Sequence, residues 1–245
     1  MTACPSRGEG VLDPDDGPPR KLPGKPCPRL VKVPGVADLR PPRLDAAADE
    51  VARIAAASPD WATLASVARS CVACPELAAT RQHVVVGDLP VSGRRPRLVL
   101  IGEAPGATED ETGRPFVGRS GAMLDQLLGE AGLSRAEAAV LNIVKCRPPG
   151  NRTPRSPEVA RCSGWLRRQL DLLDPPVVVA LGLSSAKWFL GPRTVLGQVR
   201  GRSHEWNGRA VWATYHPSAA IRFGPNGAPR AALLADLTAV AGSLS

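Results

Sequence analysis

The sequence predicts an α/β fold: a three-layer α/β/α sandwich with a central, mainly parallel four-stranded sheet. Four short apolar segments alternate with helix-like segments, which is typical of a parallel sheet covered by helices on both faces. The segment Val177–Gly182 is apolar on both faces, as a central parallel strand must be. The predicted strands are Leu98–Gly102, Ala139–Val144, Val177–Gly182 and Ala210–Thr214.

Helical segments precede, separate and follow these strands. An Ala-rich helix is predicted over residues 44–57, and a second one over Asp60–Ser70. Ser156, followed by Pro157 and Glu158, is a favourable helix start. The other predicted helices are Gly121–Glu130, Pro157–Leu173, Ser184–Leu190 and Ala228–Leu244.

The N-terminal segment differs in composition from the rest. Residues 1–43 contain 10 of the 26 prolines, mixed charges and few large apolar side chains, so we expect a disordered arm there. Residues 44–245 then form one folded domain of ordinary size. We expect Cys4 and Cys27, which fall in the arm, to be inert.

Length and charge restrict the class of protein. No apolar stretch approaches the roughly 20 residues that cross a bilayer, and the first ten residues lack the apolar stretch of a signal peptide. We therefore expect a cytoplasmic monomer with no membrane partner. The net charge of +8 favours polyanionic partners, although charge alone identifies none.

The four remaining cysteines have the spacing of metal ligands. Cys71 and Cys74 form a CxxC pair after a predicted helix, while Cys146 follows a strand and Cys162 lies on the next helix. A redox CxxC would instead open a helix after a strand, and disulfides are uncommon in the cytosol. Two of these cysteines could also be core residues. A four-thiolate metal site is the preferred interpretation, and spacing leaves zinc and an iron–sulfur cluster both open.

The loop after the first strand suggests a binding site. Gly102-Glu-Ala-Pro-Gly106 exposes backbone amides and the Glu103 carboxylate at the carboxyl end of a strand, where parallel sheets bind ligands. Phe116 follows between glycines in Gly113-Arg-Pro-Phe-Val-Gly118. A carboxylate, free amides and an aromatic ring suit a flat polar heterocycle better than a phosphate. Phe116 could also be a core residue, and Glu103 could simply pair with Arg119.

Two polar residues are expected at the same sheet edge. Asn142 lies near the end of the second strand, where a side-chain amide either caps a neighbouring loop or reads the donor and acceptor of a pyrimidine. His216 follows the fourth strand, and Pro217 stiffens its turn. Basic side chains flank these loops and are candidate phosphate contacts or solvated surface: Lys145, Arg147, Arg152 and Arg155.

Taken together, these segments resemble the uracil-DNA glycosylase superfamily, specifically the family 4 enzymes that carry a 4Fe–4S cluster. The resemblance covers about residues 60–240. It rests on four cysteines and four motifs: Gly102-Glu-Ala-Pro-Gly106, Gly113-Arg-Pro-Phe-Val-Gly118, Asn142-Ile-Val-Lys-Cys-Arg-Pro-Pro-Gly-Asn-Arg152 and His216-Pro-Ser218.

The resemblance implies a repair enzyme that hydrolyses the N-glycosidic bond of uracil flipped out of DNA. Phe116 would stack on the base and Asn142 would read its polar edge. His216 would hydrogen-bond the carbonyl oxygen where negative charge grows, and Gly102 with Glu103 would position the attacking water. The implied base-binding set also includes Gly106 and Ser218.

The resemblance also implies the cofactor and the DNA contacts. The implied ligands of the 4Fe–4S cluster, for which zinc is the alternative, are Cys71, Cys74, Cys146 and Cys162. The implied DNA-binding residues are Arg147, Arg152, Ile221 and Arg222, with Ile221 as an apolar wedge that could equally be core. A related branch bonds covalently to DNA through a His in a basic loop, but Arg147–Ser156 contains no His, so ordinary turnover is expected.

Two other functions stay open from sequence. An enzyme of the same fold could act on other deaminated or mismatched bases, although the Gly-Glu-Ala-Pro-Gly turn favours uracil. A metal-stabilised DNA-binding module without catalysis would carry the same basic surface. Uracil-containing DNA is the expected partner, and sequence does not separate single-stranded from double-stranded DNA.

Overall fold

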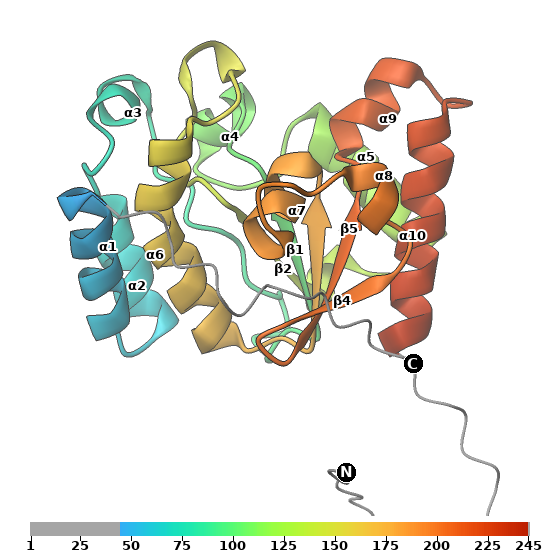
Figure 1. Cartoon of the computed structure of the whole chain (residues 1–245), viewed down its shortest axis with the longest axis horizontal. Coiled ribbons are helices and arrows are strands. Elements are labelled where there is room, and N and C mark those ends of the chain that lie inside the picture. Colours follow the sequence, from blue (N-terminus) through green and yellow to red (C-terminus); the bar gives the residue numbers. More distant parts are fainter. Residues whose placement is uncertain (1–44, 245) are drawn as a thin grey trace, which may run out of the picture.

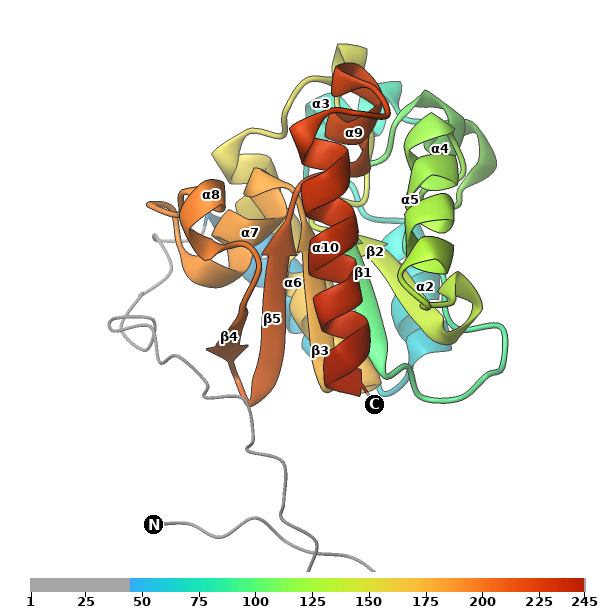
Figure 2. The ribbon, with the colours of Figure 1, turned by 90° about the vertical axis from the view of Figure 1, so that its right-hand side faces the viewer.

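The computed structural model describes residues 45–244, and its centre is a five-stranded sheet of order β2-β1-β3-β5-β4 (Figures 1 and 2). The strands are β1 (Leu98–Gly102), β2 (Ala138–Asn142), β3 (Val177–Leu181), β4 (Ser203–Trp206) and β5 (Arg209–Thr214). β2, β1, β3 and β5 are mutually parallel, and β4 pairs antiparallel with β5 at the edge. The α/β class with a mainly parallel sheet is therefore confirmed.

The predicted number of strands was wrong, because the sequence analysis missed β4. This strand is short, lies at the sheet edge and includes the polar residues His204 and Glu205. A two-residue turn, Asn207-Gly208, connects it to β5, and both turn residues have positive φ angles, 48° and 76°. Asn-Gly between two strands is a strong hairpin signal, so the sequence did contain the evidence for β4.

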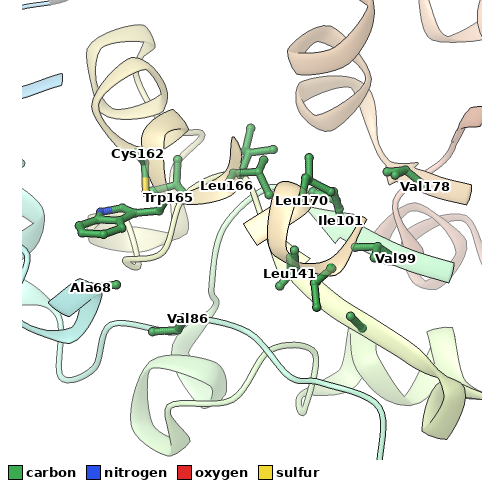
Figure 3. Packing of buried hydrophobic residues seen from close by; sticks show 14 of the residues in the cluster. Ala68, Val86, Val99, Ile101, Leu141, Cys162, Trp165, Leu166, Leu170 and Val178 are labelled. Atoms are coloured by element: carbon green, nitrogen blue, oxygen red, sulfur yellow. The ribbon is translucent and has the colours of Figure 1, made fainter. Parts of the chain in front are cut away.

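Successive strand residues point to opposite faces of the sheet and build two separate cores. On one face Val99, Ile101 and Leu141 pack among residues of α6, as the close-up in Figure 3 shows for Leu166 and Leu170. The other face packs against α5 and α10, which cross in front of the sheet in Figure 2. The helices of these layers are α5 (Arg119–Glu130), α6 (Ser156–Leu173), α7 (Leu183–Leu190) and α10 (Ala228–Leu244).

Two N-terminal helices pack outside α6 (Figure 1). They are α1 (Ala46–Ala57) and α2 (Trp61–Arg69). A side chain on Gly164 of α6 would come within 2.8 Å of the Ala52 backbone, so this glycine permits the close approach of α1. Asp45 and Asp60 accept hydrogen bonds from the first turns of α1 and α2, which fixes where each helix begins.

All six predicted helices are present, with ends within two residues of the prediction. Glu158 accepts a hydrogen bond from the Arg155 amide at 2.7 Å, which explains the start of α6. Four short helices were not predicted: α3 (Pro75–Thr80), α4 (Ala107–Thr112), α8 (Leu196–Val199) and α9 (Pro217–Phe223). They lie in the connections, where no long periodic pattern can form.

Two predictions concern the ends of the chain. The proposed arm at residues 1–43, with Cys4 and Cys27, lies outside the described residues. Between residues 45 and 244, no helix has both the length and the apolar character needed to cross a membrane.

Candidate active site

Four parallel strands end at one edge of the sheet, and the predicted polar residues gather there. Gly102 is the last residue of β1 and Asn142 is the last residue of β2, directly paired with it. Gly182 follows β3, and His216 comes two residues after the end of β5. Carboxyl ends of parallel strands form the usual ligand-binding edge of such sheets.

Gly102 is the point where the predicted base-binding groups meet. A Cβ at this position would lie 2.4 Å from Asn142 Oδ1 and 2.5 Å from Phe116 Cζ. The ring centroids of Phe116 and His216 are 5.6 Å apart, with an interplanar angle of 33°. Gly182, with φ of 93°, lies against the Cβ of His216. We call Gly102, Phe116, Asn142 and His216 the base site.

The side-chain amide of Asn142 has no hydrogen-bond partner among the described residues. Asn142 is 2% exposed, and no described residue hydrogen-bonds to its side-chain amide. Its backbone oxygen accepts a hydrogen bond of 2.7 Å from Lys145 Nζ, which fixes the end of β2. Its amide is not among the fully buried unpaired groups of the described residues, so the N and O atoms keep some contact with solvent and can bind a ligand with a complementary edge.

Two loops of the site are joined by Glu109, a residue that the sequence analysis did not single out. Its carboxylate accepts the backbone N–H groups of Gly106, Val117 and Gly118 at 2.8–3.0 Å. The Gly106 amide is therefore engaged inside the protein, so any contact between Gly106 and a base would use other atoms. Glu109 was missed because its partners are backbone groups, which leave no side-chain pattern in the sequence.

Glu103 follows β1 and is partly buried. Its carboxylate accepts a hydrogen bond from the hydroxyl of Ser184 on α7. No ion pair joins it to Arg119 in the described part of the chain. Ser184 thus orients Glu103 at the mouth of the site, and the sequence analysis had placed Ser184 only at a helix start.

His216 begins α9 and is held as a neutral ring. Its Nδ1 accepts the backbone N–H of Ser218 at 3.2 Å and lies 2.8 Å from the Ser218 hydroxyl. Burial lowers the pKa of His216 to about 4, and the negative charge of Glu109 offsets this only partly. Because Nδ1 acts as an acceptor, a neutral ring carries its proton on Nε2. His216 is therefore set up to donate from Nε2.

The four predicted metal ligands share a second site, which we call the cysteine corner. One cavity is lined by the thiols of Cys71, Cys74, Cys146 and Cys162. Cys162 and Trp165 also adjoin the core of the sheet (Figure 3). Within residues 45–244, no three His, Cys, Asp or Glu side chains converge closely enough to hold one metal ion.

Positive groups surround these thiols. Arg81 Nη1 lies 3.4 Å from Cys146 Sγ, and the backbone N–H of Lys145 donates to Cys162 Sγ at 3.3 Å. Arg161 lines the same cavity as Cys74. Without a positive ligand, burial raises the pKa of Cys146 to about 11 and that of Cys162 to about 12. The cysteine corner therefore fits a positively charged metal group, because such a group binds thiolates and the neighbouring cations would offset the negative charge that the thiolates bring.

The basic side chains predicted to contact phosphate differ in whether other groups of the protein already bind or bury them. Arg152 forms ion pairs with Glu158 at 2.6 Å and Glu76 at 3.2 Å, and Arg155 also pairs with Glu76. Lys145 is fully buried and cannot reach a phosphate on the surface. Arg147 donates to the Asn151 side chain, next to the exposed loop.

Helix α9 presents the other predicted DNA contacts. Arg222 is exposed, and Ile221, the predicted wedge, is partly buried. Phe223, two positions after Ile221, is 64% exposed. Phe223 is thus the most exposed large apolar side chain of α9, and the sequence analysis did not consider it.

Comparisons with known proteins agree with this geometry. The family model of the uracil DNA glycosylase superfamily matches residues 90–238. A type-4 uracil-DNA glycosylase of Thermotoga maritima is 44% identical over 156 residues, covering 63% of this chain and 79% of that protein. The type-4 and type-5 uracil-DNA glycosylases of Pyrobaculum aerophilum are 39% and 32% identical, over 66% and 61% of this chain and 85% and 78% of their own lengths.

Proposed function

The chain belongs to the uracil DNA glycosylase superfamily and to its type-4 group, and we propose that it excises uracil from DNA as a repair enzyme. The reaction is hydrolysis of the N-glycosidic bond between uracil and deoxyribose, which leaves an abasic site. The observation that carries this proposal is the meeting of Phe116 and Asn142 at Gly102, with the His216 ring centroid 5.6 Å from that of Phe116. A base reaches such a site only after it is flipped out of the stack.

Phe116 and Asn142 are proposed to recognise the base. The flat Phe116 ring provides a stacking surface, while the Asn142 amide offers one donor group and one acceptor. Uracil presents the complementary N–H and carbonyl groups on one edge. The unpaired state of this amide supports the role, because the base would supply the hydrogen bonds that the protein does not.

His216 is proposed to stabilise the charge that develops as the glycosidic bond breaks. The departing uracil accumulates negative charge on a carbonyl oxygen, and a donor on Nε2 would bind that oxygen more strongly in the transition state than in the substrate. A fixed donor of this kind contributes about 3–4 kcal/mol to transition-state stabilisation. The hydrogen bond from the Ser218 amide to Nδ1 supports this proton position.

Glu103 is proposed to position the water that attacks the sugar. Glu103 is the first residue after β1 and follows Gly102 of the base site directly, so it lies at the carboxyl end of the strand beside this site. The Ser184 hydroxyl restricts its orientation. A carboxylate there would also offset the positive charge that develops on deoxyribose.

The cysteine corner is proposed to hold a 4Fe–4S cluster with a structural role. The four cysteines that line one cavity, together with the family to which the chain belongs, support this assignment. Arg81, Lys145 and Arg161 would offset its negative charge. When bound, the cluster would crosslink the CxxC loop to β2 and α6, and it supplies no step of the hydrolysis.

DNA is proposed to lie across the same edge of the molecule. Arg147 and the exposed Arg222 are the best placed phosphate contacts, and Arg152 would have to exchange its ion pairs to contribute. Ile221 remains the predicted wedge, although the greater exposure of Phe223 makes this ring a second candidate. Apolar side chains of this kind fill the space left by a flipped base.

The direct test is incubation of the protein with a uracil-containing oligonucleotide, beside a control that differs only by thymine. The expected result is an alkali-labile site at uracil and none at thymine. Scission at another deaminated or mismatched base, but not at uracil, would change the substrate. Retardation of DNA on a gel without any alkali-labile site would overturn catalysis and leave a DNA-binding module.

A further inference from the structure

The backbone of Phe116 adopts an unusual conformation for an aromatic residue. Its φ angle is 52°, in the left-handed region that residues with a Cβ rarely occupy. The residue is 6% exposed, and its ring lies against Gly102. Such a conformation persists only where the surroundings determine it. Neighbouring groups of the protein therefore hold the Phe116 backbone in this conformation.

One of these groups is Arg135, whose guanidinium hydrogen-bonds the backbone carbonyls of Phe116 and of the residue before it. Nη2 donates to the Pro115 carbonyl at 2.6 Å, and Nη1 donates to the Phe116 carbonyl at 2.7 Å. Asp125 and Asp88 hold the guanidinium from the other side, at 3.2 Å and 4.0 Å. Arg135 thus makes a two-pronged contact that a lysine could not reproduce.

The rest of the Phe116 peptide is equally enclosed. A Cβ on Gly121 of α5 would lie 1.8 Å from the Phe116 carbonyl oxygen, so the glycine leaves room for this carbonyl to face Arg135. Beyond the ring, Glu109 accepts the N–H groups of Val117 and Gly118. Arg135 thus binds the carbonyls of Pro115 and Phe116, and Glu109 binds the two amides that follow. These contacts on both sides restrict the position of the Phe116 ring.

Arg135 also connects the ring to the residue proposed to read the base. It belongs to a short 3₁₀ helix, Arg135–Glu137, that leads directly into β2, and β2 ends at Asn142. The stacking loop and the base-reading strand are therefore joined by one side chain. A change in this contact would move Phe116 relative to Asn142 without touching either side chain directly.

We propose that Arg135 is a positioning residue for uracil excision: it holds the Pro115 and Phe116 carbonyls so that the Phe116 ring stays at the stacking position. This role rests on the proposed function. Arg135 acts through Phe116 and is not proposed to contact DNA. The nearest alternative is that Arg135 only stabilises the fold, as a partly buried guanidinium bound to carbonyls commonly does.

A double-mutant cycle separates these two roles. We would measure single-turnover uracil excision at saturating enzyme for the wild type, Arg135→Gln, Phe116→Ala and the double variant. Arg135→Gln is expected to lower the rate roughly tenfold to a hundredfold in the wild-type background, as misplaced groups commonly do. In the Phe116→Ala background its effect is expected to fall below about twofold, because the ring that it positions is gone.

Arg168→Gln is the matched control. Arg168 also donates to backbone carbonyl oxygen, that of Ser58 at 2.7 Å and 2.9 Å, but it lies on α6 away from the base site. It should lower the melting temperature about as much as Arg135→Gln and leave the excision rate unchanged. Arg135→Lys keeps the positive charge but not the two-pronged contact, so its rate should be intermediate. Neither Arg135 variant should change its affinity for uracil-free DNA, because Arg135 is not proposed to contact DNA.

Equal losses of rate from Arg135→Gln in both Phe116 backgrounds would overturn the proposal. So would a normal rate per folded molecule combined with a lowered melting temperature. If Arg135→Gln does not fold, the same cycle with Arg135→Lys decides by the same criterion. Absence of uracil release by the wild-type chain would overturn the proposed function and this role together, whereas additive losses would overturn this role alone.

Discussion

The base site and the cysteine corner are close in sequence, because Asn142 belongs to the first and Cys146, four residues later, belongs to the second. The two regions are nevertheless built differently. Hydrogen bonds within the protein fix the loops of the base site, as the contacts of Glu109 show. In the cysteine corner, burial raises the pKa of the thiols, so the protein alone favours their neutral forms. The fold alone therefore fixes the base site, whereas the proposed cluster would have to stabilise the thiolates of the cysteine corner.

This contrast predicts opposite consequences for substitution. Changes in the base site should alter the rate of excision more than the stability of the fold. Changes in the cysteine corner should alter stability first, because a bound metal group contributes its binding free energy to folding. The experiments below compare the two regions by measuring both quantities for each variant.

The largest effect on rate is expected at His216 and Asn142. His216→Ala and Asn142→Ala should each slow single-turnover excision by roughly a hundredfold to a thousandfold, since each removes a fixed group proposed to bind uracil. Their melting temperatures should stay close to that of the wild type. Near-normal rates in both variants would refute the proposed roles.

A second histidine provides the control for this experiment. His204 is buried at the sheet edge, where its Nε2 lies 2.8 Å from the Val199 carbonyl. His204→Ala should therefore lower the melting temperature and leave the rate per folded molecule intact. The same behaviour in His216→Ala would place His216 with the structural residues.

A smaller but still large loss of rate is expected for Gly102→Ala. The new methyl group would lie 2.4 Å from Asn142 Oδ1 and 2.5 Å from Phe116 Cζ, so both must move. Displacement of the two groups should cost roughly tenfold to a hundredfold in rate. The measurement is single-turnover excision, beside the melting temperature.

Gly129→Ala is the matched control for Gly102→Ala. Gly129 lies on α5, and its Cβ would meet nothing within 4 Å. This variant should keep its rate and gain up to about 1 kcal/mol in unfolding free energy from helix propensity. A rate within twofold of wild type for Gly102→Ala would mean that Gly102 is not the meeting point that the geometry indicates.

The ends of β1 and β2 show which parts of the site could be predicted from the sequence. The end of β1 was predicted correctly because four apolar residues run into Gly102. Asn142 was predicted near the end of the second strand, and β2 ends at Asn142, two residues before the predicted end at Val144. The location of His216 was predicted from its place after a strand. Residues at strand ends can be placed from sequence because parallel strands end at one edge.

The groups that support the site were not predictable in the same way. Glu109 and Arg135 bind backbone amides and carbonyls, and such contacts depend on how two loops meet in space. Nothing in their sequence spacing separates them from ordinary surface charges. Arg152 shows the same limit from the other side, since sequence did not reveal that this candidate phosphate contact pairs with Glu158.

The next effect is on stability, at the cysteine corner. Cys162→Ser should remove the cluster and lower the melting temperature by about 10 °C or more, because several kcal/mol of binding free energy are lost. Purified wild-type protein should contain iron and acid-labile sulfide, and the variant should not. Any folded variant should retain a measurable excision rate, since the cluster supplies no step of the reaction.

Cys27→Ser is the control, because Cys27 is outside the proposed ligand set. It should leave iron content, sulfide content and melting temperature unchanged. Stoichiometric zinc without iron in the wild type would remove the cluster from the proposal. An unchanged melting temperature in Cys162→Ser would contradict the idea that this region depends on its ligand.

The smallest effect is expected from pH. Burial lowers the pKa of His216 to about 4 from the ordinary value of 6.5, so the ring should stay neutral in the folded protein between pH 8 and pH 5. The excision rate should pass through pH 6.5 with no inflection due to this histidine, and the measurement is the single-turnover rate across this range. An inflection near pH 6.5 that disappears in His216→Gln would show that the folded ring is protonated there.

The same shift should be visible in stability. Between about pH 6.5 and pH 4 the unfolded chain binds a proton at His216 that the folded chain does not bind, so unfolding free energy from this residue falls as pH decreases. His216→Gln should remove this part of the slope, which denaturant titrations at several pH values would measure. An unchanged slope would mean that the ring is not desolvated, and the base site would then resemble the solvent-exposed surface more than a preformed pocket.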